Sequence, residues 1–368
     1  MVQLTSAQAK ALRNVTKYAR RHKPAAERQI EHILKMANVP WELFREAKEK
    51  VFKGARVALH FHPDRLAANG ESVAGNLLES GVYKNQFETS ISAGSLTARK
   101  GGLRHQHEQK LFGGAYNRWA VKGHHRPKYG ALDLTFSADG PSPRFGSCFL
   151  LLKPQISWRS TFTYLDSFTL PQSKGTYAEF DLIWSALLLD LFQSRSALGK
   201  KDVTVRGFLE SLLENVGSPH RQPHLGEASR NLDHYIEAQV HGPVSLSSDS
   251  ELLVADPSFK NTSVGHELQR LSAKYKVRLL WHMGFAMAVA EIPPDFRGAG
   301  MPSLAKRIAG EGVLTTEMIG RAVANLTKHP SAWAKRGSYA EVLQELKLLW
   351  HVLLYYGKPW AEMEGKQV

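Results

Sequence analysis

The chain has 368 residues, enough for one large domain with additions or for two domains. Its composition, 43% hydrophobic and 10% aromatic, is typical of a globular protein with a buried core. The net charge of +14 favours nucleic acid, an anionic membrane or a phosphate-bearing ligand, without selecting among them. Cys148 is the only cysteine, which excludes an intramolecular disulfide and a cysteine-based zinc site.

The sequence shows no signal for membrane insertion or secretion. Residues 1–13 lack the apolar segment of a signal peptide. The most apolar run, residues 182–189, is bounded by Asp181 and Asp190 and is far shorter than the roughly 20 residues that cross a bilayer. We therefore expect a cytoplasmic protein that does not contact a membrane.

The first 54 residues form a basic region that we expect to be helical. Thr5 offers an N-cap for a first helix, Pro24 stands where a second helix can begin, and a third is predicted over 41–52. Residues 1–56 contain 13 Lys and Arg against 5 Asp and Glu, a net +8 of the total +14. This surface is either the solvated face of a helical cap or a docking site for nucleic acid or another acidic partner.

Residues 55–295 are predicted to form an α+β core with a central mixed or antiparallel sheet. The strands lack the regular intervening helices of a doubly wound parallel sheet. They are expected at 56–62, 129–134, 145–152, 158–164 and 233–244, and as a hairpin over 277–281 and 285–292.

The segments between these strands carry helix and loop signals. A short helix over 72–80 should end at Gly81, followed by extended chain over 82–89, small polar residues over 90–97 and a loop over 99–128. A helical insertion is expected near 176–230 with a loop over 218–226, and short helices at 250–255 and 264–275. Region 296–368 is expected to be a helical C-terminal extension with helices near 301–309, 315–327 and 339–356.

One strand within 233–244 has an apolar face and a polar face, as its alternation shows. Its apolar positions Ile236, Ala238 and Val240 alternate with Glu237, Gln239 and His241. A carboxylate, an amide and an imidazole therefore form one polar row on this strand.

Four short motifs occur along the chain in an order that is also found in a known protein superfamily. His60 stands in the first strand, and the following helix ends at Gly81. Tyr129 begins the run Tyr-Gly-Ala-Leu, and Glu237 lies in the late strand Tyr-Ile-Glu-Ala-Gln-Val. This order resembles the ADP-ribosyltransferase superfamily, the fold shared by diphtheria-toxin-like enzymes and poly-ADP-ribose polymerases.

The resemblance implies an NAD-dependent glycosyltransferase that moves ADP-ribose to a macromolecular acceptor, protein or nucleic acid, or that hydrolyses NAD. Glu237 is then the catalytic carboxylate, because positive charge develops on the ribose as nicotinamide leaves. No metal ligand is implied, and the biological role stays open between a toxin, a repair factor and a regulator. The runs 60–65 and 237–242 also resemble an uncharacterised bacterial protein family, which implies no function.

The same resemblance implies a set of residues that bind NAD. Tyr129 would stack on the nicotinamide ring. His60 would hydrogen-bond the adenosine-side ribose, and Arg65 would pair with the pyrophosphate through its fork of donors. By analogy of position, Gln86, Thr89 or Ser90 would line the pocket, and Gln239 would help to orient the acceptor.

A metal-dependent hydrolase is the first alternative. His60 and His62 lie two apart on a strand and so share one face, about 6–7 Å apart at their Cα atoms. Asp64 follows them, and a His-x-His-x-Asp run resembles the opening of several metal-dependent hydrolases.

A binding module without turnover is the second alternative. Basic residues occur with the aromatic residues Tyr18, Trp41, Trp119 and Trp158, a combination that can engage RNA or DNA. The sequence contains no Gly-rich phosphate loop of the P-loop or Rossmann kind and no Gly-x-Ser-x-Gly nucleophile elbow.

Overall fold

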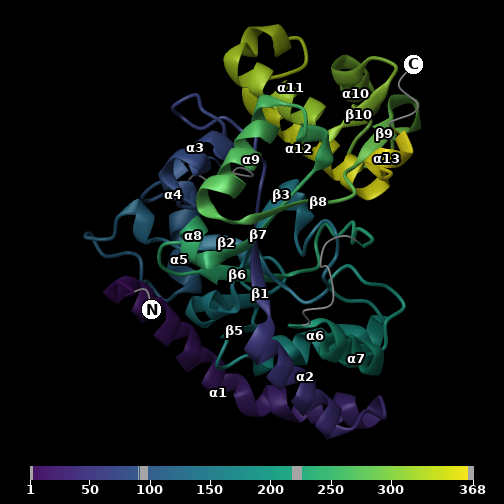
Figure 1. Ribbon diagram of the computed structural model, residues 1–368. Coiled ribbons are helices and arrows are strands. Elements are labelled where there is room, and N and C mark those ends of the chain that lie inside the picture. Colours follow the sequence, from purple (N-terminus) through teal and green to yellow (C-terminus); the bar gives the residue numbers. More distant parts are fainter. Residues whose placement is uncertain (1–2, 90, 92–97, 218–225, 364–368) are drawn as a thin grey trace.

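The α+β fold predicted from the sequence is confirmed in the computed structural model of the protein, which describes residues 3–89, 91, 98–217 and 226–363. An eight-stranded sheet crosses the middle of the molecule, between the N-terminal helices and the C-terminal helices (Figure 1). Its strand order is β5-β4-β6-β2-β1-β3-β7-β8. The strands are β1 Arg56–Phe61, β2 Lys128–Asp133, β3 Cys148–Leu152, β4 Ser160–Tyr164, β5 Lys174–Thr176, β6 Ile236–Val240, β7 Ser250–Ala255 and β8 Arg278–Trp281.

Neighbouring strands are antiparallel except at one edge, where β7 and β8 are parallel. These two strands are joined by α9 (Ser263–Tyr275), because parallel neighbours need a crossover rather than a tight turn. The strands predicted at 56–62, 129–134, 145–152, 158–164 and 233–244 are confirmed with adjusted ends.

The two faces of the sheet differ in polarity because side chains alternate along each strand. Val57 and Leu59 of β1 and Ile236 of β6 belong to the main hydrophobic cluster on one face. Ala58 and His60, the alternate residues of β1, point to the other face. The first face is therefore the core of the protein, and the second is free to carry polar groups.

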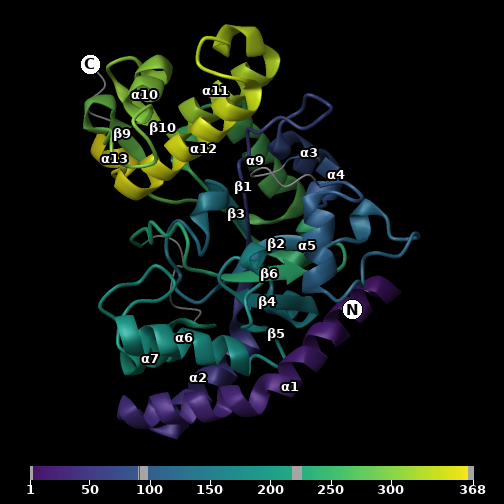
Figure 2. The ribbon, with the colours of Figure 1, turned by 180° about the vertical axis from the view of Figure 1, so that it is seen from behind.

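Helices α1 (Ser6–Met36), α2 (Trp41–Gly54), α6 (Asp181–Ser194) and α7 (Val205–Asn215) pack on the core face, and Figure 2 shows them together on one side of the sheet. Ion pairs reinforce this packing: Arg20 Nε lies 2.7 Å from Glu179, and Lys23 Nζ lies 3.4 Å from Asp181. The basic N-terminal region therefore uses part of its charge in contacts within the chain. The residues that these helices add to the main cluster include Ile30, Phe44, Leu187 and Leu209. Helices α3 (Val73–Ser80) and α9 also add residues to the main cluster.

The expectation that Pro24 begins a second helix is wrong. Helix α1 runs unbroken through Pro24, which lies exposed on its outer side. On its inner side, Ala19 and Ala26 pack with Leu182 of α6. This continuous packing outweighs the helical hydrogen bond to the carbonyl of Arg20 that proline cannot form.

The segment 82–89, expected to be extended, ends instead in the helical turn α4 (Gln86–Thr89). Asn85 starts this turn, since its Oδ1 accepts a hydrogen bond from the backbone N–H of Phe87 at 2.8 Å. Local side-chain capping of this kind competes with extended structure and is weakly marked in a sequence.

The segment 99–128, expected to be a loop, contains the helix α5 (Leu103–Leu111) and the 3-10 turn η1 (Gly123–His125). Helix α5 is polar, and its inner side includes the buried Glu108, which forms an ion pair with Arg126. A helix held by a charged group lacks the apolar periodicity that reveals helices in a sequence.

Two predictions near the end of the sheet are also wrong. Residues 250–255, expected to be helical, form β7, whose Leu252, Leu253 and Val254 are all buried. A strand buried on both faces has no alternation to distinguish it from a helix. The predicted hairpin does not form, since β8 pairs with β7 while β9 (Ala286–Ala288) pairs with β10 (Val313–Thr315) in a second sheet.

The predicted C-terminal helices are confirmed and form a second hydrophobic cluster. Trp350 of α12 belongs to this cluster, and its Nε1 donates a hydrogen bond to the carbonyl of Pro143 at 3.2 Å. This bond connects the C-terminal region to η2 (Pro143–Phe145) beside the sheet. The confirmed helices are α10 Met301–Ala309, α11 Thr316–Lys328 and α12 Tyr339–Tyr356, and a short helix that was not predicted, α13 Trp360–Met363, follows them.

Shorter elements complete the fold. The predicted helix ending at Gly81 is confirmed as α3 (Val73–Ser80), with Ser72 as N-cap and Gly81 at φ +65°. The others are α8 Leu246–Asp249, η3 Pro154–Arg159, η4 Ser167–Thr169, η5 Pro257–Phe259, η6 Val289–Glu291 and η7 Pro330–Trp333.

The predictions for 90–97 and for the loop over 218–226 fall almost entirely outside the described residues. Within the described parts of the chain, no helix combines the length and the apolar character that crossing a membrane requires.

Replacing Pro24 with Ala should stabilise the protein, because α1 gains an interior hydrogen bond that proline cannot make. We expect the free energy of unfolding to rise by about 1–3 kcal/mol, measured by urea denaturation. Pro40→Ala is the matched control, since Pro40 is the N-cap of α2 and replaces no interior bond. Equal shifts in the two variants would contradict the role given to Pro24.

Candidate functional site

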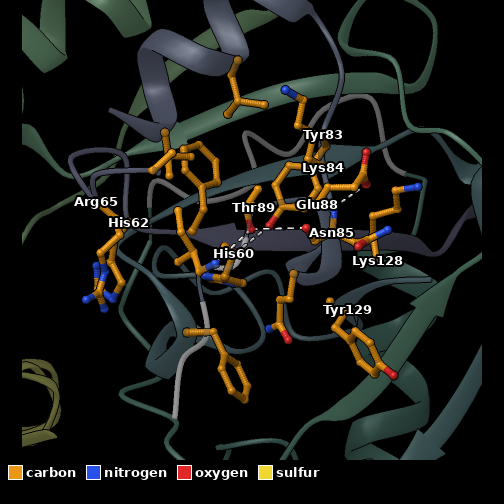
Figure 3. Close-up of a pocket in the computed structure, with 18 of the residues that line it drawn as sticks. His60, His62, Arg65, Tyr83, Lys84, Asn85, Glu88, Thr89, Lys128 and Tyr129 are labelled. Atoms are coloured by element: carbon orange, nitrogen blue, oxygen red, sulfur yellow. Dashed lines mark hydrogen bonds between the residues drawn. The ribbon is translucent and has the colours of Figure 1, made fainter. Parts of the chain in front are cut away.

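A cavity of about 560 Å³ lies over the polar face of the sheet. Its walls come from β1, β2 and β6, from α3, residues 82–89 and α5, and from η2, η4 and α12. In Figure 3, His60 lies between Arg65 on one side and Tyr129 on the other. Six of the seven predicted site residues that the structure describes line this cavity: His60, Arg65, Gln86, Thr89, Tyr129 and Glu237.

Strand register places three of these residues on one face of the sheet. Ala58 of β1 lies opposite Ala131 of β2, and Ala131 lies opposite Glu237 of β6. Residues two apart in a strand point the same way, so His60, Tyr129 and Glu237 share a face of three adjacent strands. Glu237 is displaced by two residues along β6 from the position opposite Tyr129, so the three residues span about 12 Å, and one small molecule can contact all three.

Glu237 is 6% exposed and is held by two hydrogen bonds. Its Oε2 accepts from the backbone N–H of Ser167 at 3.3 Å, and its Oε1 accepts from the Gln239 amide at 2.9 Å. Gln239 is itself fixed, because its Oε1 accepts from the Thr161 hydroxyl at 2.7 Å. The carboxyl group therefore has a defined orientation at the cavity wall.

Burial raises the pKa of Glu237 to about 7, and the charge of Asp166 raises it further. The hydrogen bonds from Ser167 and Gln239 lower this pKa without cancelling the effect of burial. Asp166 also lines the cavity, so two carboxyl groups face the same space. Near neutral pH Glu237 is divided between its two protonation states, a property typical of functional carboxyl groups.

The His60 ring is held by backbone groups at both nitrogens. Nδ1 lies 3.0 Å from the carbonyl of Gly146, which can only accept, and Nε2 lies 3.4 Å from the N–H of Ser142, which can only donate. Gly140 has φ +75°, and a Cβ there would lie 2.7 Å from Nε2, so glycine is needed beside the ring. A ligand hydroxyl would have to share Nε2 with the Ser142 amide.

Tyr129 is positioned by charged groups of α5. Its hydroxyl donates to Glu108 Oε1 at 3.1 Å, and the Arg104 guanidinium lies 5.1 Å from its ring centroid. Glu108 is fully buried and forms an ion pair with Arg126. Burial raises the pKa of Glu108, while the charge of Arg126 acts in the opposite direction. The buried pair thus forms the support behind Tyr129.

The cavity wall on the side of His60 away from Tyr129 is cationic. Arg65 follows β1, Arg144 comes from η2 and Lys347 comes from α12, and all three line the cavity. Burial lowers the pKa of Arg65, although the neighbouring Asp64 raises it. Positive side chains from three distant segments therefore meet at one end of the site.

The other three predicted residues differ in how they relate to the cavity. The Oε1 atom of Gln86 is buried and has no hydrogen-bond partner among the described residues, which leaves it available to a ligand. Thr89 lines the cavity, and its hydroxyl donates to the Asn85 carbonyl at 3.2 Å. Gln239 is fully buried and is not part of the cavity wall, so its contact is with Glu237 rather than with a ligand.

The residues of the metal-hydrolase alternative do not meet at one common site. His62 lines the cavity with its ring centroid 5.6 Å from that of Trp350. Asp64 is not part of the lining and lies against Gly320 of α11. Both ring nitrogens of His60 already bond to backbone. Among the described residues, no three His, Cys, Asp or Glu side chains are grouped as metal ligands.

Sequence reasoning missed five cavity or supporting residues, namely Arg104, Glu108, Arg144, Asp166 and Lys347. Arg104 and Glu108 are four apart, a spacing that places both on one side of a helix, and this was the only available signal. The other three reach the cavity through the tertiary fold and carry no local mark in the sequence.

These features define an α+β protein with a buried carboxyl group and a cationic wall in one cavity. The chain belongs to the family described as "Protein of unknown function (DUF3626)", whose model matches residues 56–356. It is also similar to "Gene 2 protein" of Mycobacterium phage D29, with 29% identity over 158 residues that cover 40% of this chain and 55% of the phage protein. The chain thus spans about half the length of this curated relative.

Glu237→Gln should change how stability depends on pH. Folded Glu237 keeps its proton up to about pH 7, whereas the unfolded side chain releases it near pH 4.5, so the wild type loses stability as pH rises between these values. Relative to the variant, we expect this loss to reach about 3 kcal/mol, measured by urea denaturation at pH 4.5 and 7.5. A stability difference between wild type and variant that does not change with pH would refute a buried Glu237 with a raised pKa.

Arg126→Met should destabilise the protein more than the double change Glu108→Gln with Arg126→Met. The single change leaves a buried charge without its partner, which costs about 3–5 kcal/mol. The double change removes both charges. Thermal and urea unfolding of both variants measure the difference, and additive losses would show that the ion pair does not couple the two sites.

Proposed function

We propose that this protein binds NAD in the cavity and transfers its ADP-ribose to a macromolecular acceptor or to water, with Glu237 as the catalytic carboxylate. The supporting observation is that His60, Tyr129 and Glu237, on β1, β2 and β6, share one face of the sheet and one cavity, in the order of the resembling superfamily. The cavity, at about 560 Å³, is within the usual size range of small-molecule sites.

In the proposed reaction, the bond between ribose C1′ and the nicotinamide nitrogen breaks, and its electron pair stays with nicotinamide, which leaves neutral. Ionised Glu237 stabilises the positive charge that develops on the ribose. The acceptor nucleophile, or water, then bonds to C1′ and releases a proton. Asp166, on the same wall as Glu237, would accept this proton.

The cavity offers a contact for each part of NAD. The nicotinamide ring would stack on the face of Tyr129 that is turned away from Arg104. The unpaired Oε1 of Gln86 can accept a hydrogen bond from the carboxamide N–H of nicotinamide. Arg65 would pair with the pyrophosphate, and His60 would shape the wall between the two ends.

The proposed acceptor is a protein or a nucleic acid, and an acidic one suits the basic N-terminal helices. Arg13, Lys17 and Arg21 of α1 are exposed and could contact such a partner. A cytoplasmic location is part of the same proposal, since the single cysteine, Cys148, is a buried free thiol.

Release of nicotinamide from NAD is the direct test of this function. Wild type should release it, with transfer of adenine-labelled ADP-ribose when an acceptor is present, and Glu237→Ala should lose about 100-fold or more of the rate. The wild-type rate should rise as pH increases through about 7, because the ionised form of Glu237 is required. Glu251→Gln, on β7 and outside the cavity lining, is the matched control.

Nicotinamide release and label transfer that persist in Glu237→Ala would rule out this function.

The two alternative functions predict different experimental results. A metal hydrolase requires stoichiometric bound metal that is lost in the double variant His60→Ala with His62→Ala. A nucleic-acid-binding module requires affinity that falls steeply with salt and no turnover at all.

A further inference from the structure

Three cationic side chains gather on the cavity wall nearest the C-terminal region, and a fourth lies beside them outside the lining. Arg65, Arg144 and Lys347 line the cavity. Arg297, after η6, joins them through Asp233, which forms an ion pair with Arg144 and lies 3.9 Å from Arg297. Burial lowers the pKa of Lys347, and the charges of Arg144, Arg65 and Arg297 lower it further while Asp166 raises it. These cations therefore lie close enough to repel one another.

The acidic groups near this wall do not neutralise it fully. Asp233 has 60% of its side chain exposed, which weakens its pairing through solvent screening. Asp64 faces Arg65, but burial raises the pKa of Asp64 to about 7, so part of its charge is absent at neutral pH. Asp166 is the carboxyl group that remains beside Lys347 on the cavity wall.

One buried hydrogen-bond donor on this wall has no partner within the described residues. It is the Nε atom of Arg144, whose side chain lines the cavity. A buried donor without a partner is costly, and an anion bound in the cavity would satisfy it.

We propose that Arg65, Arg144 and Lys347 form a subsite for the phosphate group of a ligand, which makes α12 part of the binding site. Guanidinium groups bind phosphate oxygens through two parallel hydrogen bonds, and a lysine adds a third cationic contact. The identification of that phosphate with the diphosphate of a dinucleotide rests on the proposed function. The family match ends at residue 356, the last residue of α12, so this helix lies within the unit that the family shares.

Isothermal titration calorimetry of the full chain with inorganic pyrophosphate, ADP and adenosine tests the subsite. Wild type should bind pyrophosphate and ADP, and Lys347→Ala and Arg144→Ala should each weaken both by about tenfold or more. Lys347→Arg should retain most of the affinity. Lys306→Ala, which removes an exposed charge on α10, is the control and should bind like wild type.

Three results would overturn the subsite: no binding of pyrophosphate or ADP to wild type, unchanged affinity in both alanine variants, or an equal loss for adenosine. Circular dichroism and thermal unfolding of each variant separate lost binding from lost folding, and Lys347→Arg provides a folded comparison. Lys347-dependent ADP binding without NAD cleavage would refute the proposed function and keep the subsite. Glu237-dependent NAD cleavage with unchanged ADP affinity in both alanine variants would refute the subsite and keep the proposed function.

Discussion

Alternation of side chains along β1, β2 and β6 is the constraint on which both the core and the cavity depend. The same three strands bury Leu59, Leu132 and Ile236 on one face and carry His60, Tyr129 and Glu237 on the other. A shift of register by one residue would exchange the two sets, exposing the core and burying the polar residues. The large hydrophobic core therefore fixes the geometry of the site.

The two buried carboxyl groups of the polar face, Glu108 and Glu237, have different partners. Glu108 lies fully buried behind Tyr129 but is paired with Arg126, so its burial does not leave an isolated charge. Glu237 has hydrogen bonds to Ser167 and Gln239 but no cationic partner among its pKa-shifting neighbours, which is why its pKa stays raised. The structure thus distinguishes a supporting carboxylate from one that exchanges a proton near neutral pH.

Sequence reasoning succeeded where the signal was local. Alternation revealed β1, β2 and β6, and the order of His60, Tyr129 and Glu237 along the chain anticipated their common face and cavity. It failed for β7, which is buried on both faces, and for α5, whose position depends on an ion pair to a residue outside the helix.

The cationic wall was beyond sequence reasoning for a different reason. Arg144 and Lys347 are separated by about two hundred residues and meet only because α12 packs beside η2. No pattern along the chain encodes such a meeting. Gln239 was placed on the correct face by alternation, but only the structure shows that it lies behind Glu237 and not on the cavity wall.

Helices α1 and α2 cover an apolar surface of the segment that matches the family. The family match begins at residue 56, the first residue of β1, and therefore leaves both helices out. Yet Ile30 and Phe44 of these helices are part of the main cluster, against which α6 and α7 also pack. A chain made of the matched segment alone would expose this apolar surface to water. In this chain α1 and α2 provide the cover that the matched segment needs.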